Sequence, residues 1–131
     1  MSTAPRIRID LNSPVPAYQQ IVDAIRALLV DGTLAQGAVL PPVRRLAMDL
    51  GVHFNTVAEA YRVLAAEGWL DLRRRRGATV LERDTPAKAD PATIDEFRRR
   101  LRGLVAEVLA KGATPARVMR ELRTQAEGLD R

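Results

Sequence analysis

Residues 41–70 read PPVRRLAMDLGVHFNTVAEAYRVLAAEGWL. Apolar side chains recur there at three- and four-residue intervals in two runs, which predicts two short amphipathic helices. The buried faces are expected to comprise Val43, Leu46, Ala47 and Leu50 in the first helix and Val57, Ala60, Tyr61 and Leu64 in the second. Only three residues separate Gly51, which ends the first helix, from the second helix at about 55–67. A connection this short, with glycine at its start, is typical of a helix-turn-helix.

Two more elements are predicted on either side of this pair. An earlier helix runs from near Pro16 to Gly32, because the apolar residues between them again line one face. Residues 7–10, IRID, alternate between apolar and charged and predict a short strand. After the pair, residues 69–74 and 78–82 have strand patterns on either side of a basic turn. We therefore expect a β hairpin, or wing, directly after the helix-turn-helix.

The remainder of the chain is expected to be helical. Residues 84–92 are small, polar and interrupted by prolines, and we interpret them as a linker. Beyond them, apolar residues follow the a and d spacing of a heptad until Gly112, and Thr114 with Pro115 is expected to start a last helix. Two helices with such wide apolar faces cannot bury them against each other alone. The first domain or a second copy of the chain must therefore cover the surplus.

The predicted fold class is mainly α with a small β wing. It consists of a winged helix-turn-helix domain at residues 1–83, the linker at 84–92, and a C-terminal two-helix hairpin at 93–131.

Composition limits the classes of function. The 131 residues are 47% apolar, yet no run of 18 apolar residues occurs and the first 16 residues hold no continuous hydrophobic region. Membrane insertion and export are therefore not expected, and a cytoplasmic location is predicted. With no cysteine and one histidine, thiolate and histidine-cluster metal sites are excluded, so no metal or cofactor is expected. The sequence shows no activated nucleophile, no paired acid and base, and no phosphate-binding glycine loop. An enzyme is therefore not expected.

The charge distribution favours an acidic partner. The chain has 21 Lys and Arg against 16 Asp and Glu, a formal net charge of +5, and its wing turn contains the consecutive run Arg73 to Arg76. Such a run attracts phosphates, although a solvated charged turn is the alternative interpretation. A helix-turn-helix presents its second helix to the major groove of DNA. The polar residues Asn55, Thr56 and Arg62 are expected to face outward on that helix.

Residues 16–80 resemble the winged-helix DNA-binding domain of GntR-type bacterial transcription regulators. The resemblance rests on the pattern Leu-Pro-x-x-Arg-x-Leu-Ala at residues 40–47, on Asn55-Thr56-Val57, and on Glu-Gly-Trp-Leu at residues 67–70. The short helical C-terminal segment and the opening strand resemble the YtrA-type subfamily, in which the second domain serves dimerisation. This implies a dimer interface formed by Ile94, Phe97, Leu101, Leu104, Val108, Val118 and Leu122.

The resemblance also assigns residues to DNA contacts. Arg44 matches a phosphate-contacting arginine, and Asn55 and Thr56 match the start of the recognition helix, which touches backbone and base edges. His53 just before them is kept among the candidate DNA contacts, although we interpret it first as a turn or capping residue. The wing tip is matched by Arg74, Arg75, Arg76 and Gly77.

Three positions depart from the family pattern. Arg75 replaces a wing glycine, and Glu59 stands where a basic residue is common, so it would repel phosphates unless it pairs with Arg62 or accepts a hydrogen bond from cytosine. Phe54 replaces arginine or proline. It is a candidate for filling the core, for stacking on a sugar or for contacting a thymine methyl group.

The leading hypothesis is a homodimeric, sequence-specific transcription regulator, with repression favoured over activation, that binds an inverted-repeat operator in double-stranded DNA. The alternative is a winged-helix protein-interaction module without sequence-specific DNA binding. The residues identify no effector ligand.

Overall fold

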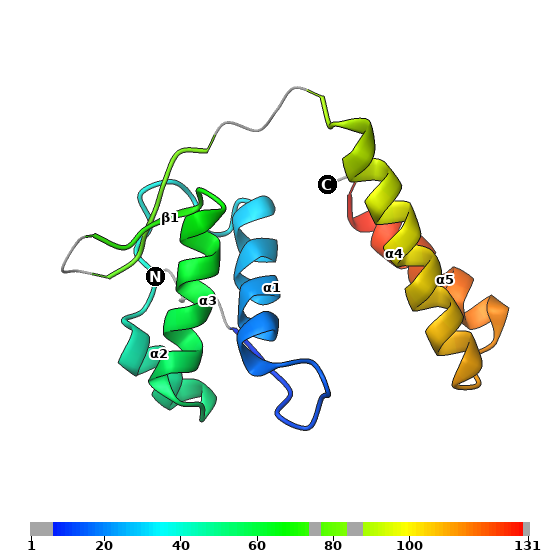
Figure 1. The fold of residues 1–131 in the computed structure, drawn as a ribbon, viewed down its shortest axis with the longest axis horizontal. Coiled ribbons are helices and arrows are strands. Elements are labelled where there is room, and N and C mark those ends of the chain that lie inside the picture. Colours follow the sequence, from blue (N-terminus) through cyan, green and yellow to red (C-terminus); the bar gives the residue numbers. More distant parts are fainter. Residues whose placement is uncertain (1–6, 74–76, 84–87, 130–131) are drawn as a thin grey trace. The chain divides into compact units, whose positions relative to one another are not determined.

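The structure, a computed structural model, describes residues 7–73, 77–83 and 88–129. Its fold is mainly helical with one small sheet, as the sequence predicts (Figure 1). The elements are α1 (Ala17–Val30), α2 (Val43–Leu50), α3 (Phe54–Ala66), β1 (Leu70–Asp71), β2 (Thr79–Val80), α4 (Pro91–Ala110) and α5 (Pro115–Gly128). The chain divides into two compact units, Met1–Asp84 and Thr85–Arg131.

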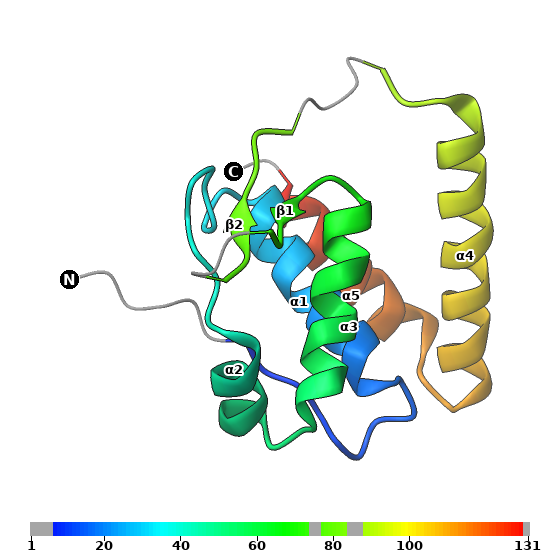
Figure 2. The same ribbon diagram turned by 60° about the vertical axis from the view of Figure 1, so that its left-hand side comes forward.

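The core of the first unit lies around α3. Helices α1 and α2 both pack against it, and Figures 1 and 2 show α1 running alongside α3. The apolar face predicted for α3 is confirmed, because all four of its residues are at most 2% exposed. In α2, Leu46 and Ala47 are buried, whereas Val43 and Leu50 are half-buried against the core. Burial of each large apolar side chain contributes about 1.5–3 kcal/mol to the free energy of unfolding.

The wing is a short antiparallel hairpin with an additional partner. Leu70 pairs with Val80, and Asp71 with Thr79. On the other edge of β2, Leu40 donates a backbone hydrogen bond to Ala78 (2.8 Å), and Val80 donates one to Ala38 (2.8 Å). The segment before α2 therefore holds the wing against the helices, and the paired strands are shorter than the predicted runs.

The strand predicted at residues 7–10 is wrong. In the described ranges this segment pairs with no strand, and the side chain of Gln20 bonds the backbone of Asp10 instead. The Asp10 N–H donates to Gln20 Oε1 (2.7 Å), and Gln20 Nε2 donates to the Asp10 carbonyl oxygen (2.9 Å). Ile7 and Ile9 still pack against the core. The alternation of apolar residues therefore predicted the burial of Ile7 and Ile9 correctly, but it did not predict that the segment forms no strand.

The second unit consists of two helices in contact with each other. Asp90 caps α4 by accepting a hydrogen bond from the Ala92 N–H (3.0 Å). Helix α4 consequently begins at Pro91, inside the segment interpreted as a linker. Thr114 caps α5 as predicted, through its Oγ1 and the Arg117 N–H (3.2 Å). Neither helix contains a fully buried residue.

Candidate nucleic-acid interface

The turn between α2 and α3 has the geometry of a helix-turn-helix. Gly51 adopts a left-handed conformation with φ of 71°, which a residue without Cβ reaches at little cost. The Val52 N–H donates to the Ala47 carbonyl (3.0 Å) and closes the end of α2. Helix α3 starts only three residues after Gly51, so the helix-turn-helix predicted from the sequence is confirmed.

His53 begins α3 as its capping residue. Its Nδ1 accepts a hydrogen bond from the Asn55 N–H at 3.1 Å, which satisfies one of the amides that lack a partner in the first helical turn. The interpretation of His53 as a capping residue is therefore confirmed. Its contact with DNA stays a prediction.

Arg44 lies against the start of α3. Its guanidinium carbon is 4.6 Å from the centre of the Phe54 ring, and that ring stacks on His53 with 4.4 Å between the ring centres. Within the described part of the chain Arg44 forms no ion pair. Its charge is thus held in place by an aromatic ring and remains available to an anion.

Asn55 and Thr56 line a shallow groove at the start of α3. Pro16, Ala17 and Tyr18 from the beginning of α1 line its other side, together with Glu59 of α3. Asn55 is exposed, and Thr56 is half-buried. Tyr18 was not predicted as a neighbour of Asn55, because no local pattern relates two positions 37 residues apart.

Glu59 and Arg62 form an ion pair on the exposed face of α3. Arg62 Nη2 lies 2.8 Å from Glu59 Oε2, and both side chains are at least half exposed. Such a surface pair contributes about 0–1 kcal/mol to stability. The pair matters for electrostatics instead, because Arg62 neutralises the Glu59 carboxylate, which would otherwise repel a phosphate. Pairing with Arg62 was one of the two alternatives predicted for Glu59.

The wing approaches the outer face of α3. Arg62 and Gly77 line one groove, together with Ala58 of α3 and Leu72 of the wing. Gly77 has φ of 105°, and a Cβ there would lie 3.5 Å from the Leu40 carbonyl oxygen, so the turn needs glycine for its backbone rather than for space. The predicted wing residues Arg74, Arg75 and Arg76 lie outside the described residues.

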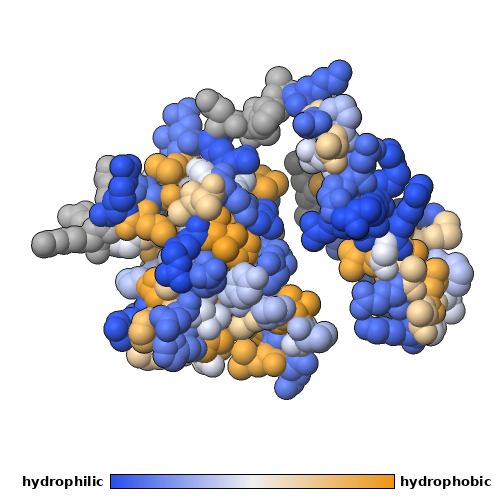
Figure 3. Space-filling view, in the orientation of Figure 1, coloured by the Kyte–Doolittle hydropathy of each residue, from blue (hydrophilic) through white to orange (hydrophobic). Residues whose placement is uncertain are grey.

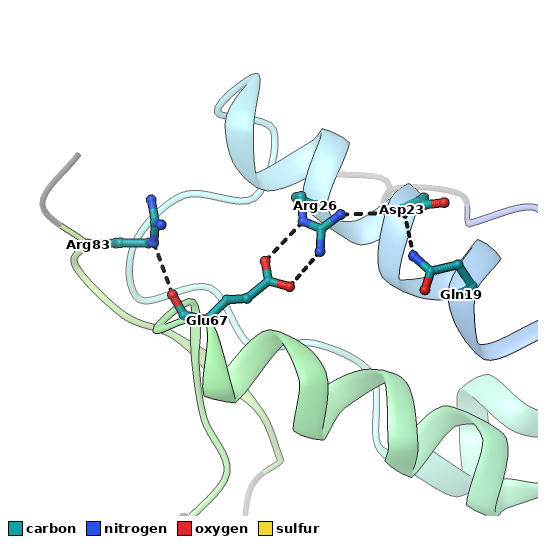
Figure 4. A network of polar contacts seen from close by, with 5 residues as sticks. All are labelled: Gln19, Asp23, Arg26, Glu67 and Arg83. Carbon is teal, nitrogen blue, oxygen red and sulfur yellow. Dashed lines mark hydrogen bonds and ion pairs between the residues drawn. The ribbon is translucent and has the colours of Figure 1, made fainter. Parts of the chain in front are cut away.

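A polar network joins the far end of α3 to α1 (Figure 4). Arg26 of α1 donates through Nε to Glu67 Oε1 (3.0 Å), and this hydrogen bond raises the pKa of Arg26. Arg83, which follows the wing, donates to the Glu67 carbonyl (3.1 Å) and lies over the Trp69 ring. The network holds α1, the end of α3 and the chain after β2 together.

Five of the seven predicted dimer residues line one groove of the second unit. A groove between α4 and α5 is lined by Leu101, Leu104, Val108, Val118 and Leu122, among others. Phe97 and Leu104 are 62% and 60% exposed, and Figure 3 shows hydrophobic residues at the surface of this unit. Ile94 is also exposed. Within the second unit the structure therefore brings Leu101, Leu104, Val108, Val118 and Leu122 together, whereas Ile94 and Phe97 lie outside this groove.

Comparison with known proteins identifies the family. The gntR family of bacterial regulatory proteins matches residues 17–80. The HTH-type transcriptional regulator Rv1152 of Mycobacterium tuberculosis is 34% identical over 120 residues, which cover 88% of this chain and 90% of that protein. The chain belongs to the GntR family. This GntR-family chain is also 38% identical over 76 residues to the transcriptional repressor YtrA of Bacillus subtilis, with 58% of each chain covered.

Solved structures agree with this assignment. YtrA from Sulfolobus acidocaldarius, a GntR-family transcription factor, is 36% identical with a TM-score of 0.56 over 79% of this chain and 97% of that one. The sequence and structural likeness together make the chain a YtrA-type GntR regulator. The AraR DNA-binding domain, solved in complex with an operator, shares the fold at 21% identity (TM-score 0.52, covering 59% of this chain and 99% of that one).

Other relatives are longer than this chain. It spans 15% of the MocR regulatory protein of Rhizobium meliloti, to which 72 residues, 55% of this chain, are 40% identical.

Among residues 7–73, 77–83 and 88–129, no group of three His, Asp or Glu side chains could hold a metal ion. In the same ranges, every helix is too short or too polar to cross a membrane.

Proposed function

We propose that this GntR-family chain is a sequence-specific DNA-binding transcription repressor that binds an inverted-repeat operator as a homodimer. The observation that carries the proposal is the state of Arg44 at the start of the helix-turn-helix. Its guanidinium is fixed on the Phe54 ring and forms no ion pair with the described residues. A cation held there suits a DNA phosphate.

The residues around Arg44 suit DNA contact as well. The major groove, about 12 Å wide, admits an α-helix, and α3 would enter it with Asn55 and Thr56 foremost. The Glu59–Arg62 pair leaves little net negative charge on that face. The consecutive arginines Arg74 to Arg76 would add phosphate contacts.

The homodimer is supported by the exposed apolar surface of α4 and α5. Large hydrophobic side chains at 60% exposure are stabilised when a second copy covers them. A two-fold dimer would present two copies of α3 to two half-sites whose centres lie one helical turn, about 10 base pairs, or a multiple of that apart.

Relatives support the repressor role and the partner. The Bacillus subtilis protein YtrA is a transcriptional repressor, and the AraR domain was solved with its operator. By this likeness, the partner of the present chain is an operator duplex. A chain that binds bacterial genomic DNA is expected in the cytoplasm.

A gel-shift titration tests the proposal. The full chain is titrated into duplexes from the promoter region of its own gene, with scrambled duplexes of equal length as controls. We expect one fragment to be retarded and to resist competition by random DNA. No retardation of any fragment at low salt overturns the proposal. Equal competition by random DNA would favour the protein-interaction module instead.

A further inference from the structure

Phe54 is an aromatic side chain that the core does not use. It is the first residue of α3, while the buried face of that helix is formed by Val57, Ala60, Tyr61 and Leu64. The Phe54 side chain is 37% exposed. Isolated exposed hydrophobic residues are common on proteins, so its exposure alone means little. Its position and its neighbours make it informative.

The Phe54 ring is held by two neighbours at the surface. The Arg44 guanidinium lies over the ring at 4.6 Å, and the His53 imidazole stacks on it at an interplanar angle of 29°. His53 is itself fixed by its cap on α3. A ring fixed in this way loses little conformational entropy when a ligand contacts it. Ordering the side chain therefore subtracts little from the binding free energy of an apolar contact there.

Both contacts engage the flat face of the ring. A ligand that approaches the ring edge leaves the Arg44 and His53 contacts in place. In the major groove the apolar feature is the C5 methyl group of thymine, and phenylalanine is among the side chains suited to it. The adjacent Asn55 can bond only polar base atoms. Thr56 also carries a methyl group, but it is half-buried, so Phe54 supplies the larger apolar contact at the start of α3.

We propose that Phe54 is a specificity-determining residue that recognises the methyl group of one thymine in each half-site. The inference rests on the proposed DNA-binding function. Because the Arg44 guanidinium lies on the ring, this thymine is next to the phosphate that Arg44 contacts. Burial of one methyl group is equivalent to about 0.8 kcal/mol, which is about fourfold in affinity per half-site and about 15-fold for two.

The test replaces each thymine in turn with deoxyuridine, which removes only the methyl group. The probe is the tightest duplex that the full chain selects from a random library, substituted symmetrically in both half-sites. Phe54→Ala removes the ring, and Phe54→Gln keeps a long side chain while removing the apolar ring. Val30→Ala is the matched control, because Val30 is 69% exposed and is the last residue of α1, whereas the first residues of α1 lie beside the start of α3. Circular dichroism checks that each variant is folded.

We expect one symmetric thymine position at which deoxyuridine weakens binding of the wild type and of Val30→Ala by about 15-fold. The same substitution should leave the affinity of both Phe54 variants unchanged. If no position distinguishes the wild type from the Phe54 variants while the wild type still prefers its selected duplex, the inference fails and the proposed function stands. If the wild type binds a scrambled duplex equally well, the proposed function fails, and the inference with it.

Discussion

At the residue scale, two neighbouring arginines of α2 have different surroundings. Arg45 lies 3.6 Å from Asp49 one turn along the helix, whereas Arg44 lies on the Phe54 ring. A carboxylate neutralises a guanidinium, but an aromatic ring attracts it without cancelling its charge. Two identical side chains in sequence thus offer different charges to a phosphate.

This difference predicts unequal effects on DNA binding. Arg44→Ala should weaken binding to all duplexes and lower the slope of log affinity against log salt by about 0.9, the value for one lost phosphate contact. Arg45→Ala is the matched control and should leave the slope unchanged. Titrations at several salt concentrations measure both slopes. Equal changes in the two variants would contradict the assignment of Arg44 as the phosphate contact.

Tyr61 illustrates a buried hydroxyl that stabilises the first unit. Its Oη donates to the Pro41 carbonyl oxygen at 2.6 Å, and burial raises the pKa of the hydroxyl above its usual range. Tyr61→Phe should lower the free energy of unfolding by about 1 kcal/mol, because the Pro41 carbonyl loses its partner. Urea unfolding followed by Trp69 fluorescence measures the change. The exposed Tyr18 supplies the control, and Tyr18→Phe should unfold like the wild type.

At the element scale, α3 depends on how it begins. Its start carries the cap, the Arg44 contact and the groove residues Asn55 and Thr56 within four consecutive positions. The wing depends on a different principle, since two-residue strands are stabilised by the additional bonds from residues 37–40. Both elements are short, and each is fixed by a neighbour rather than by its own length.

The cap makes a prediction about α3. His53→Ala should cost about 1 kcal/mol of unfolding free energy, since the Asn55 amide loses its acceptor. His53→Asn should restore most of that loss, because asparagine is among the best capping residues. Thermal unfolding of the three proteins side by side provides the measurement. Equal melting of the alanine and asparagine variants would show that capping is not what His53 contributes.

At the scale of the whole molecule, the two units differ in how they are stabilised. Among its described residues the first unit buries 15 hydrophobic side chains, while α4 and α5 bury none fully. Two packed helices with one open apolar face are marginal on their own. The second unit is therefore expected to be stabilised by association.

This expectation is tested on one helix with two neighbouring changes. Leu104→Glu places a charge on the exposed apolar surface and should convert the proposed dimer to monomer in sedimentation experiments. Gly103→Glu adds the same charge one residue earlier, away from that surface, where a new side chain meets no atom within 4 Å. It should remain dimeric. A wild-type monomer at micromolar concentration would contradict the homodimer.

Local pattern alone was sufficient for most elements. The period of the apolar residues predicted α1, α2, α3 and the helical C-terminal unit, because an amphipathic helix records its buried face in residues close along the chain. Capping residues such as Thr114, and the glycine that ends α2, marked boundaries for the same reason. The candidate site followed from the helix-turn-helix and the GntR resemblance together.

Contacts between distant residues came only from the tertiary structure. Three contacts join segments that no sequence spacing relates. They are the contact of Arg44 with Phe54, the groove that Tyr18 shares with Asn55, and the backbone bonds between the wing and residues 37–40. The same limitation explains residues 7–10, whose alternation predicted a strand although Gln20 occupies both backbone groups of Asp10. The sequence specifies which side chains must be buried, whereas partner choice depends on which surfaces meet when the helices pack.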